Sequence, residues 1–168
     1  AYTGDKLDLQ KMIDDTETEM ANGTPNICEA SFSYNGLYCA VDILKKDGDG
    51  WAIYEVKSST KHQKDDGSWT DDKEVYIADI SYQKYVLEHC GVNVTGTYLV
   101  CLNGDYVFDG NLDLNKLFFI SDVAEEVKDA AEDFQQAIDS SIRRIRPGQI
   151  VTGTVIGITD NEILVNVG

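Results

Sequence analysis

The stretch Asn26–Ser59 reads NICEASFSYNGLYCAVDILKKDGDGWAIYEVKSS and divides into three strand-like runs joined by short turns. The first run, Ile27–Tyr34, ends at Asn35-Gly36, a dipeptide typical of two-residue hairpins. The second run is Leu37–Lys46 and the third is Trp51–Ser58, with the polar loop DGDG between them. The pattern therefore predicts a meander of three antiparallel strands.

The lengths of the two turns determine which residues of this meander face each other. A two-residue turn at Asn35-Gly36 places Glu29 opposite Asp42. A four-residue loop before the third strand places Asp42 opposite Glu55. We therefore expect the three carboxylates in one row, with Lys57 on the same face because it lies two residues beyond Glu55. The opposite face, with Val41, Ile43 and Val56 among its residues, is expected to pack in the core.

Such a row of carboxylates needs compensation. Opposed side chains on neighbouring strands are only about 4.5–5.5 Å apart, so like charges there destabilise a sheet unless a cation or protons are bound. Oxygen ligands with no histidine nearby favour Mg²⁺ or Mn²⁺ over zinc. The alternative interpretation is that one turn contains a bulge and the carboxylates diverge into solvent. The row and its lysine favour a divalent metal site.

The order of these residues resembles a known family. Asp42 on one strand, followed on the next by Glu55-Val56-Lys57, resembles the Asp…Glu-Xaa-Lys pattern of the PD-(D/E)XK nuclease superfamily. The resemblance extends over about residues 7–127 and is to the RecB-like branch, which includes the exonucleases of CRISPR adaptation. The segments that carry it are Glu29-Ala-Ser-Phe, Ala40-Val-Asp-Ile-Leu, Tyr54-Glu-Val-Lys-Ser-Ser-Thr and Ile80-Ser-Tyr-Gln-Lys-Tyr.

This resemblance implies a fold and an activity. The fold would be α/β (α+β), with a restriction-endonuclease-like core of helix, three-stranded meander, helix and further strands, in which helices flank a mixed central sheet. The activity would be Mg²⁺- or Mn²⁺-dependent hydrolysis of DNA phosphodiester bonds by a cytoplasmic protein that is part of a larger DNA-processing protein. Asp42, Glu55, Glu29 and the carbonyl of Val56 would bind the metal, and Lys57 would orient the attacking water.

Residues Tyr76–Cys90 have helical periodicity, and Gly91 follows as a stop signal. Gln83 lies on the apolar face of this helix, where a buried amide needs hydrogen-bond partners. In RecB-like nucleases a glutamine on this helix points at the active site, so Gln83 matches that role. The tyrosine that those members place four residues later does not carry over, because Leu87 stands there. The alternative is a core glutamine bonded to the backbone. The apolar face comprises Tyr76, Ile77, Ile80, Val86 and Leu87.

The flanking segments are simpler. Leu7–Ala21 has the apolar spacing of an amphipathic helix. Ser59–Val75 has no periodicity and is expected to be a loop, in which Lys61 and His62 are either exposed without a role or in contact with phosphates. His89, at the end of its helix, is expected to interact with the helix dipole.

The C-terminal half continues with strands. Val94–Leu102 is expected to be a strand that turns at Asn103-Gly104, a second hairpin signal, into a strand over Asp105–Phe108. Leu112–Ile120 is a short apolar segment. Acidic residues after Ser121 predict the start of a helix that runs to about residue 140.

The charge of the chain opposes nucleic-acid binding. The 168 residues have a net charge of −16, and residues 1–128 contain 24 acids, 11 lysines and no arginine. Affinity for phosphates usually comes from basic residues. Three interpretations remain: the DNA-holding surface lies in other parts of a longer protein, bound metal ions offset the charge, or the domain is a non-catalytic nuclease-fold module that mediates protein contacts.

The composition excludes other classes. No apolar run reaches the roughly 20 residues of a membrane span, and no signal peptide is present. The cysteines at 28, 39, 90 and 101 form no Cys-x-x-Cys motif, so a zinc knuckle is not expected. We expect all four to be reduced core residues, with Cys28 and Cys39 on the face away from the acids.

The last part of the chain changes in composition, which predicts a boundary near Ser140 between a nuclease-like domain, 1–140, and a tail, 141–168. The tail carries Arg143, Arg144 and Arg146, and its residues 147–168 resemble the opening strands of an OB-fold RNA-binding domain. Such a tail could bind RNA, could be a fused segment, or could be another hairpin. Because the chain ends in a strand-like pattern, we expect it to be part of a longer protein.

Overall fold

A computed structural model of the chain describes residues 4, 8–60, 73–128, 154–158 and 163–166. The chain divides into two units, Ala1–Gln135 and Gln136–Gly168. The first unit contains a five-stranded sheet with its helices, and the second contains a two-stranded hairpin. The elements are α1 (Leu9–Ala21), β1 (Asn26–Tyr34), β2 (Leu37–Asp47), β3 (Gly50–Thr60), α2 (Lys73–His89), β4 (Val94–Leu102), α3 (Leu114–Leu117), β5 (Phe118–Asp122), β6 (Thr154–Ile158) and β7 (Ile163–Asn166).

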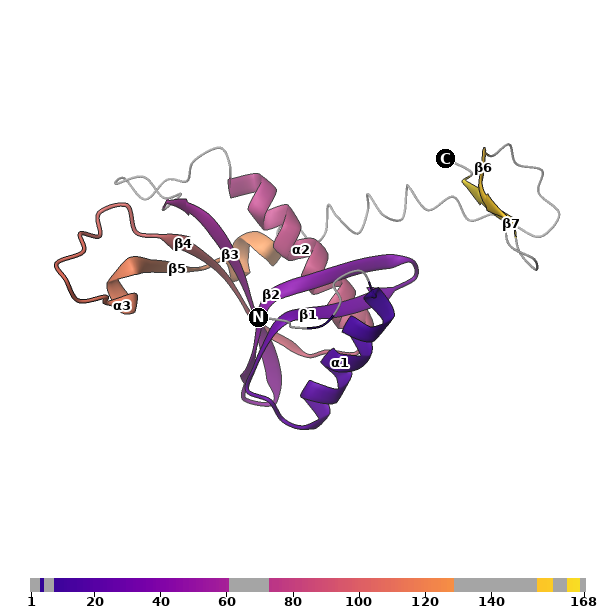
Figure 1. Cartoon of the computed structure of the whole chain (residues 1–168), viewed down its shortest axis with the longest axis horizontal. Coiled ribbons are helices and arrows are strands. Elements are labelled where there is room, and N and C mark those ends of the chain that lie inside the picture. The colour runs from indigo at the N-terminus through magenta and orange to yellow at the C-terminus, as the bar shows by residue number, and fades with distance from the viewer. Residues whose placement is uncertain (1–3, 5–7, 61–72, 129–153, 159–162, 167–168) are drawn as a thin grey trace. The chain divides into compact units, whose positions relative to one another are not determined.

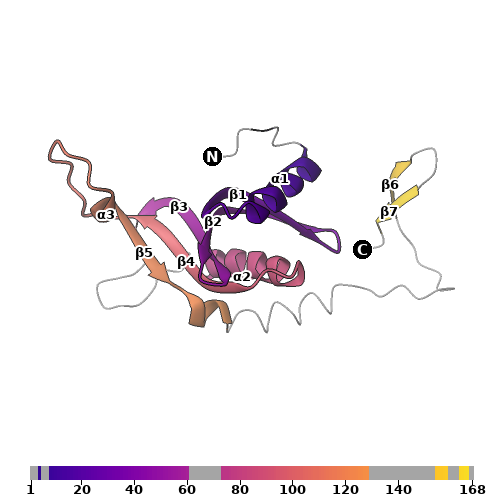
Figure 2. The same ribbon diagram turned by 90° about the horizontal axis from the view of Figure 1, so that it is seen from below.

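The first unit is a mixed sheet flanked by helices, as the sequence predicts. Its strand order is β1-β2-β3-β4-β5. The β3–β4 pair is parallel, with α2 as the crossover, and the other pairs are antiparallel. Figures 1 and 2 show α1 and α2 on opposite faces of the β1–β2 hairpin. The fold class is therefore α+β.

The strand register agrees with the sequence prediction. Asn35 and Gly36 form the turn with φ values of 49° and 81°, and Ala30 pairs with Val41. Lys46 pairs with Trp51, as expected, although the loop after β2 is shorter than expected. The ladder continues to the pair Asp47–Gly50, which leaves a two-residue turn and the same register.

The alternation of faces, by contrast, is interrupted in both strands of the first hairpin. Glu29 has a φ of 57°, a left-handed conformation that a regular strand does not contain. Ile27 and Ala30 on β1, and Val41 and Leu44 on β2, all belong to one core cluster although each pair is three residues apart. An uninterrupted strand would place residues three apart on opposite faces. The two strands therefore change face together at Glu29 and its neighbours on β2.

This change of face corrects the predicted core. Leu44 is fully buried, whereas Ile43, which was expected to pack in the core, is half-buried. Val56 was also expected in the core, but its side chain is exposed. Cys39 lies in the cluster that α2 covers, the face to which Glu55 also points, so its expected place on the opposite face was wrong.

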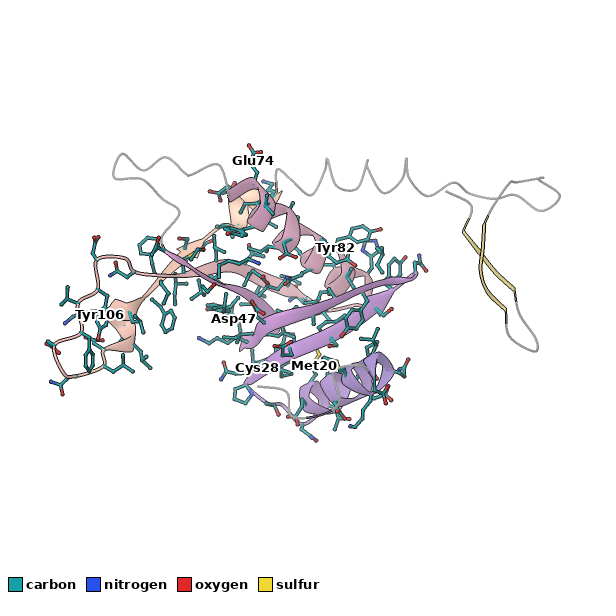
Figure 3. All side chains as sticks on the ribbon, turned by 45° about the horizontal axis from the view of Figure 1, so that its top comes forward. Met20, Cys28, Asp47, Glu74, Tyr82 and Tyr106 are labelled. Carbon is teal, nitrogen blue, oxygen red and sulfur yellow. The ribbon has the colours of Figure 1, made fainter. Side chains whose placement is uncertain are left out.

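Two hydroxyl groups connect the helices to the first hairpin. The Thr16 hydroxyl on α1 accepts a hydrogen bond from the Ser31 amide of β1 at 2.9 Å, in a buried position. The Tyr82 hydroxyl on α2 donates to the Tyr38 carbonyl at 2.7 Å and accepts from the Tyr38 amide at 3.1 Å. Tyr82 extends from α2 toward the β1–β2 hairpin in Figure 3. These bonds satisfy backbone groups that the edge of the sheet leaves without strand partners.

The segment after β4 differs from its prediction. Residues 105–108 form no strand, and the antiparallel partner of β4 is β5 instead. The Asn103 amide donates to the Leu117 carbonyl at 2.8 Å, which closes this connection. Ser121 is a strand residue paired with Leu99, so the next helix begins at residue 124, where the Asp122 carboxylate accepts from the Ala124 amide. The expected extension of that helix beyond residue 128 lies outside the described residues.

The second unit consists of β6 and β7, paired antiparallel with Val155 opposite Val165. A strand pair at this place is what the tail sequence predicts. The arginines at 143, 144 and 146 and the predicted boundary near residue 140 lie outside the described residues. None of the helices within the described ranges is both long and apolar enough to cross a membrane.

The four cysteines are free thiols, but only Cys39 and Cys101 are buried. The expectation that Cys28 and Cys90 are core residues was wrong, because both are exposed. Cys28 lies at the change of face in β1, where it points away from the core cluster. Cys90 follows the end of α2, and its thiol lies 3.4 Å from the Ser33 carbonyl.

We expect these thiols to react in two groups. Burial raises the pKa of Cys39 to about 12, so its thiolate fraction at pH 8 is on the order of 10⁻⁴. Burial also raises the pKa of Cys90, which slows its reaction with thiol reagents. A thiol-reactive dye at pH 8 should label two cysteines in the native protein and four in denaturant, and Cys28→Ser should remove the fast phase. Rapid labelling of Cys39 in the folded protein would contradict this prediction.

Candidate functional site

Glu55 on β3 is the centre of the candidate site. Its side chain is nearly buried, and both carboxylate oxygens accept hydrogen bonds: Oε1 from Lys57 Nζ at 2.5 Å and Oε2 from Gln83 Nε2 at 2.7 Å. Burial raises the pKa of Glu55, the bonds from Lys57 and Gln83 oppose that rise, and the nearby charge of Asp42 adds to it. A carboxylate in this position is costly to ionise without a positive partner.

Lys57 provides that positive partner. Its ammonium contacts Glu55 and also lies 3.1 Å from Asp79 Oδ2 on α2 and 5.0 Å from the centre of the Tyr76 ring. Burial lowers the pKa of Lys57, but the hydrogen bonds and charges of Glu55 and Asp79 outweigh this effect. The pKa of Lys57 is therefore raised above its ordinary value. Lys57 is therefore a fixed cation between two carboxylates, one from the sheet and one from the helix.

Asp42 lies where β2 and β3 stop pairing. Within the described residues, the pairing of β2 with β3 ends at Ile43–Tyr54, one pair before the expected pair of Asp42 and Glu55. The Val56 amide donates instead to Asp42 Oδ2 at 2.8 Å. The carboxylate thus replaces the backbone acceptor that a continued ladder would offer, and the strands part beside Glu55.

Gln83 is the second buried group of the site. Its side chain is 4% exposed, and its amide nitrogen bonds to the Glu55 carboxylate and not to the backbone. Its oxygen, Oε1, is buried and accepts no hydrogen bond from any residue that the structure describes. Buried amide oxygens nearly always have a partner, so an acceptor that is left open next to a buried carboxylate is suited to a ligand.

Glu29 does not join the other two carboxylates in a metal-binding set. Within the described ranges, no group of three or more His, Cys, Asp or Glu side chains is placed to bind one ion. Glu29 instead lines a pocket with residues of α1, among them Lys11 and Asp15. The physical reason is the left-handed backbone at Glu29, which ends the regular alternation on which the predicted row depended. The bulge in a turn that we considered as the alternative does not explain this, because β1 and β2 keep the same register on both sides of Glu29, with Cys28 opposite Ile43 and Ala30 opposite Val41.

The structure also adds a residue that the sequence analysis missed. Asp79 reaches Lys57 from α2, four residues before Gln83. Residues at that spacing lie on one face of a helix, so the spacing from Gln83 was a usable signal. Of the remaining candidates, His89 has a ring nitrogen 2.8 Å from the Tyr85 carbonyl, and its ring centre lies 4.7 Å from that of Tyr34 in a tilted arrangement. Lys61 and His62 lie outside the described residues.

The donors at this place fit a hard divalent cation. Asp42 and Glu55 offer carboxylate oxygens, and Gln83 offers an amide oxygen that is open. Val56, whose carbonyl is expected as a further ligand, is held beside Asp42 by its amide. Mg²⁺ and Mn²⁺ prefer such oxygen ligands, and Mg²⁺ typically takes one or two protein carboxylates and keeps several waters. The two carboxylates of Asp42 and Glu55 are therefore sufficient to bind one Mg²⁺ ion. The position of the Lys57 ammonium group shows that a positive charge fits beside Glu55.

Comparison with known proteins does not assign a function to this site. No family model matches the chain, and no curated protein matches it. A solved structure, the crystal structure of SSO0001, is similar over 76% of this chain and 59% of its own length, with 13% sequence identity and a TM-score of 0.31. A likeness at this level carries no argument about fold or function. The function has to be argued from the residues themselves.

Proposed function

We propose that this protein is a metal-dependent nuclease that hydrolyses DNA phosphodiester bonds, as part of a larger DNA-processing protein. The observation that carries the proposal is the convergence on Glu55 of a lysine two residues away and a glutamine from the crossover helix, beside a second carboxylate, Asp42. A purely structural sheet has no need to bury a carboxylate there. The free cysteines support a cytoplasmic location.

In this proposal each residue has a separate task. Asp42, Glu55 and the Val56 carbonyl would hold Mg²⁺ or Mn²⁺, and a bound ion would lower the pKa of water and offset phosphate charge. Lys57 orients the attacking water and stabilises the additional negative charge on the phosphate during attack. Gln83 holds Glu55 in place through Nε2 and keeps Oε1 for a bound water or the ion.

A second candidate is a non-catalytic nuclease-fold module that mediates protein contacts. It is favoured by the net charge of −16, which opposes DNA binding by this chain alone. It is also compatible with Lys57 held between two carboxylates. The two candidates differ in whether the site binds a divalent ion.

Calorimetric titration with Mn²⁺ separates them. We expect the wild-type chain to bind Mn²⁺ and Asp42→Ala to lose at least about tenfold in affinity, because a charged ligand is removed. Asp122→Ala is a matched control, since Asp122 lies at the end of β5, where its carboxylate accepts a hydrogen bond from the Ala124 amide outside the site. Labelled single- and double-stranded DNA should be cleaved only by the proteins that bind Mn²⁺.

Each result leads to a different conclusion. Binding without cleavage would mean that this part of the protein lacks the surface that holds DNA. Absence of Mn²⁺ binding at millimolar concentration would favour the non-catalytic candidate.

A further inference from the structure

We propose that Asp79 is a positioning residue that holds the ammonium group of Lys57 when Glu55 turns to a bound metal ion. The inference rests on the proposed metal-dependent function of Glu55. It assigns a role to a helix residue that neither the Asp…Glu-Xaa-Lys pattern nor the glutamine position includes.

Lys57 and a bound metal ion would compete for the Glu55 carboxylate. Lys57 Nζ contacts Glu55 Oε1 at 2.5 Å, which is direct contact with an oxygen that a metal ion would require. An ammonium and a divalent cation repel each other strongly at such a distance in a site of low dielectric. Metal binding therefore requires Lys57 to give up this contact.

Asp79 is the acceptor to which the ammonium group of Lys57 can move. Asp79 Oδ2 is already 3.1 Å from the same Nζ atom, so Lys57 keeps a charged acceptor without crossing the site. The Lys57 side chain is 22% exposed. An ammonium in this half-buried place would otherwise lose both its partner and part of its hydration. Asp79 thus lowers the cost of releasing Glu55.

Asp79 lies at the surface of α2, so its contact with Lys57 can be removed without disturbing the core. Its side chain is 42% exposed, so its replacement by asparagine leaves no cavity and removes no core contact. Asp79 and Gln83 are separated by one helical turn of α2 and contact Lys57 and Glu55 respectively. One turn of α2 therefore positions both charged residues of the Glu-Xaa-Lys motif: Asp79 positions Lys57, and Gln83 positions Glu55.

A double-mutant cycle on the full chain tests this role by Mn²⁺ calorimetry. We expect Asp79→Asn to weaken Mn²⁺ binding about fivefold, within the range of partly exposed ion pairs. In the Lys57→Met background the same change should alter affinity less than about twofold, because no ammonium remains to be held. Asp79→Glu should restore most of the affinity. Glu88→Gln is the matched control: Glu88 is on the same helix, 48% exposed, and 3.9 Å from Lys84.

The outcomes are distinguishable. Equal affinities of Asp79→Asn and Glu88→Gln would overturn the inference and leave the metal site intact. An equal loss in both backgrounds would show that Asp79 acts through its charge alone, which also overturns it. A wild-type chain that binds no Mn²⁺ would overturn the proposed function together with this inference.

Discussion

Replacing Lys57 by methionine should lower the rate of DNA cleavage about 10²–10³-fold, the range seen when one donor to a developing negative charge is removed. Methionine keeps the length and apolar stem of lysine and removes only the ammonium group. Mn²⁺ binding should persist, because Lys57 is not a ligand and competes with the metal for Glu55. The measurement is single-turnover cleavage of labelled DNA at saturating Mn²⁺, with binding checked by calorimetry.

Lys84→Met is the matched control for this prediction. Lys84 lies on α2 and its ammonium is 3.9 Å from Glu88, so the change removes one positive charge without touching the site. Cleavage by Lys84→Met should stay within about twofold of wild type, as expected for a surface pair. Cleavage by Lys57→Met at the wild-type rate would remove Lys57 from the reaction. An equal loss in both variants would instead indicate a general effect of charge on DNA binding.

Replacing Leu44 by alanine should lower the free energy of unfolding by about 2–5 kcal/mol, the usual cost of such a truncation in a core. Leu44 is fully buried in the cluster that α2 covers. The neighbouring change, Ile43→Ala, removes nearly as much apolar volume from a half-buried side chain and should cost less than half as much. Denaturant unfolding followed by circular dichroism gives both values.

This pair of variants tests the change of face in β2. A regular strand that buried Val41 would also bury Ile43 and expose Leu44. A larger loss for Ile43→Ala than for Leu44→Ala would therefore contradict the strand geometry described above. The slopes of the unfolding curves should be unchanged, which would show that the variants alter stability and not the extent of unfolding.

Much of the sheet was predictable from local signals. The dipeptide Asn35-Gly36 determined the first hairpin because both residues accept a positive φ, and the register of β1 with β2 followed. The register of β2 with β3 was also predicted, although the turn between them is shorter. The second hairpin was predicted wrongly from Asn103-Gly104, since the same dipeptide there begins a longer connection to β5. A turn signal specifies a turn only where the following residues can pair.

The candidate site was predictable in part. Periodicity placed Gln83 on the inner face of α2, and the two-residue spacing placed Lys57 on the same face as Glu55. The predicted partnership with Glu29 was not found, because the alternation of β1 is interrupted at that residue. Glutamate has no preference for the left-handed region, so the sequence does not predict this backbone conformation at Glu29. It is seen only in the folded structure.

The amino-acid sequence thus specified what depends on neighbours along the chain: the strands of the meander and their register, the two long helices and the carboxylate–lysine pair of β3. The tertiary structure decided what depends on distant segments. It brought Asp79 to Lys57 and Gln83 to Glu55 across the crossover, and it separated Glu29 from Asp42 and Glu55. The reason is that a buried charge takes its partners from whatever elements pack around it, and that packing involves residues that are remote in the sequence.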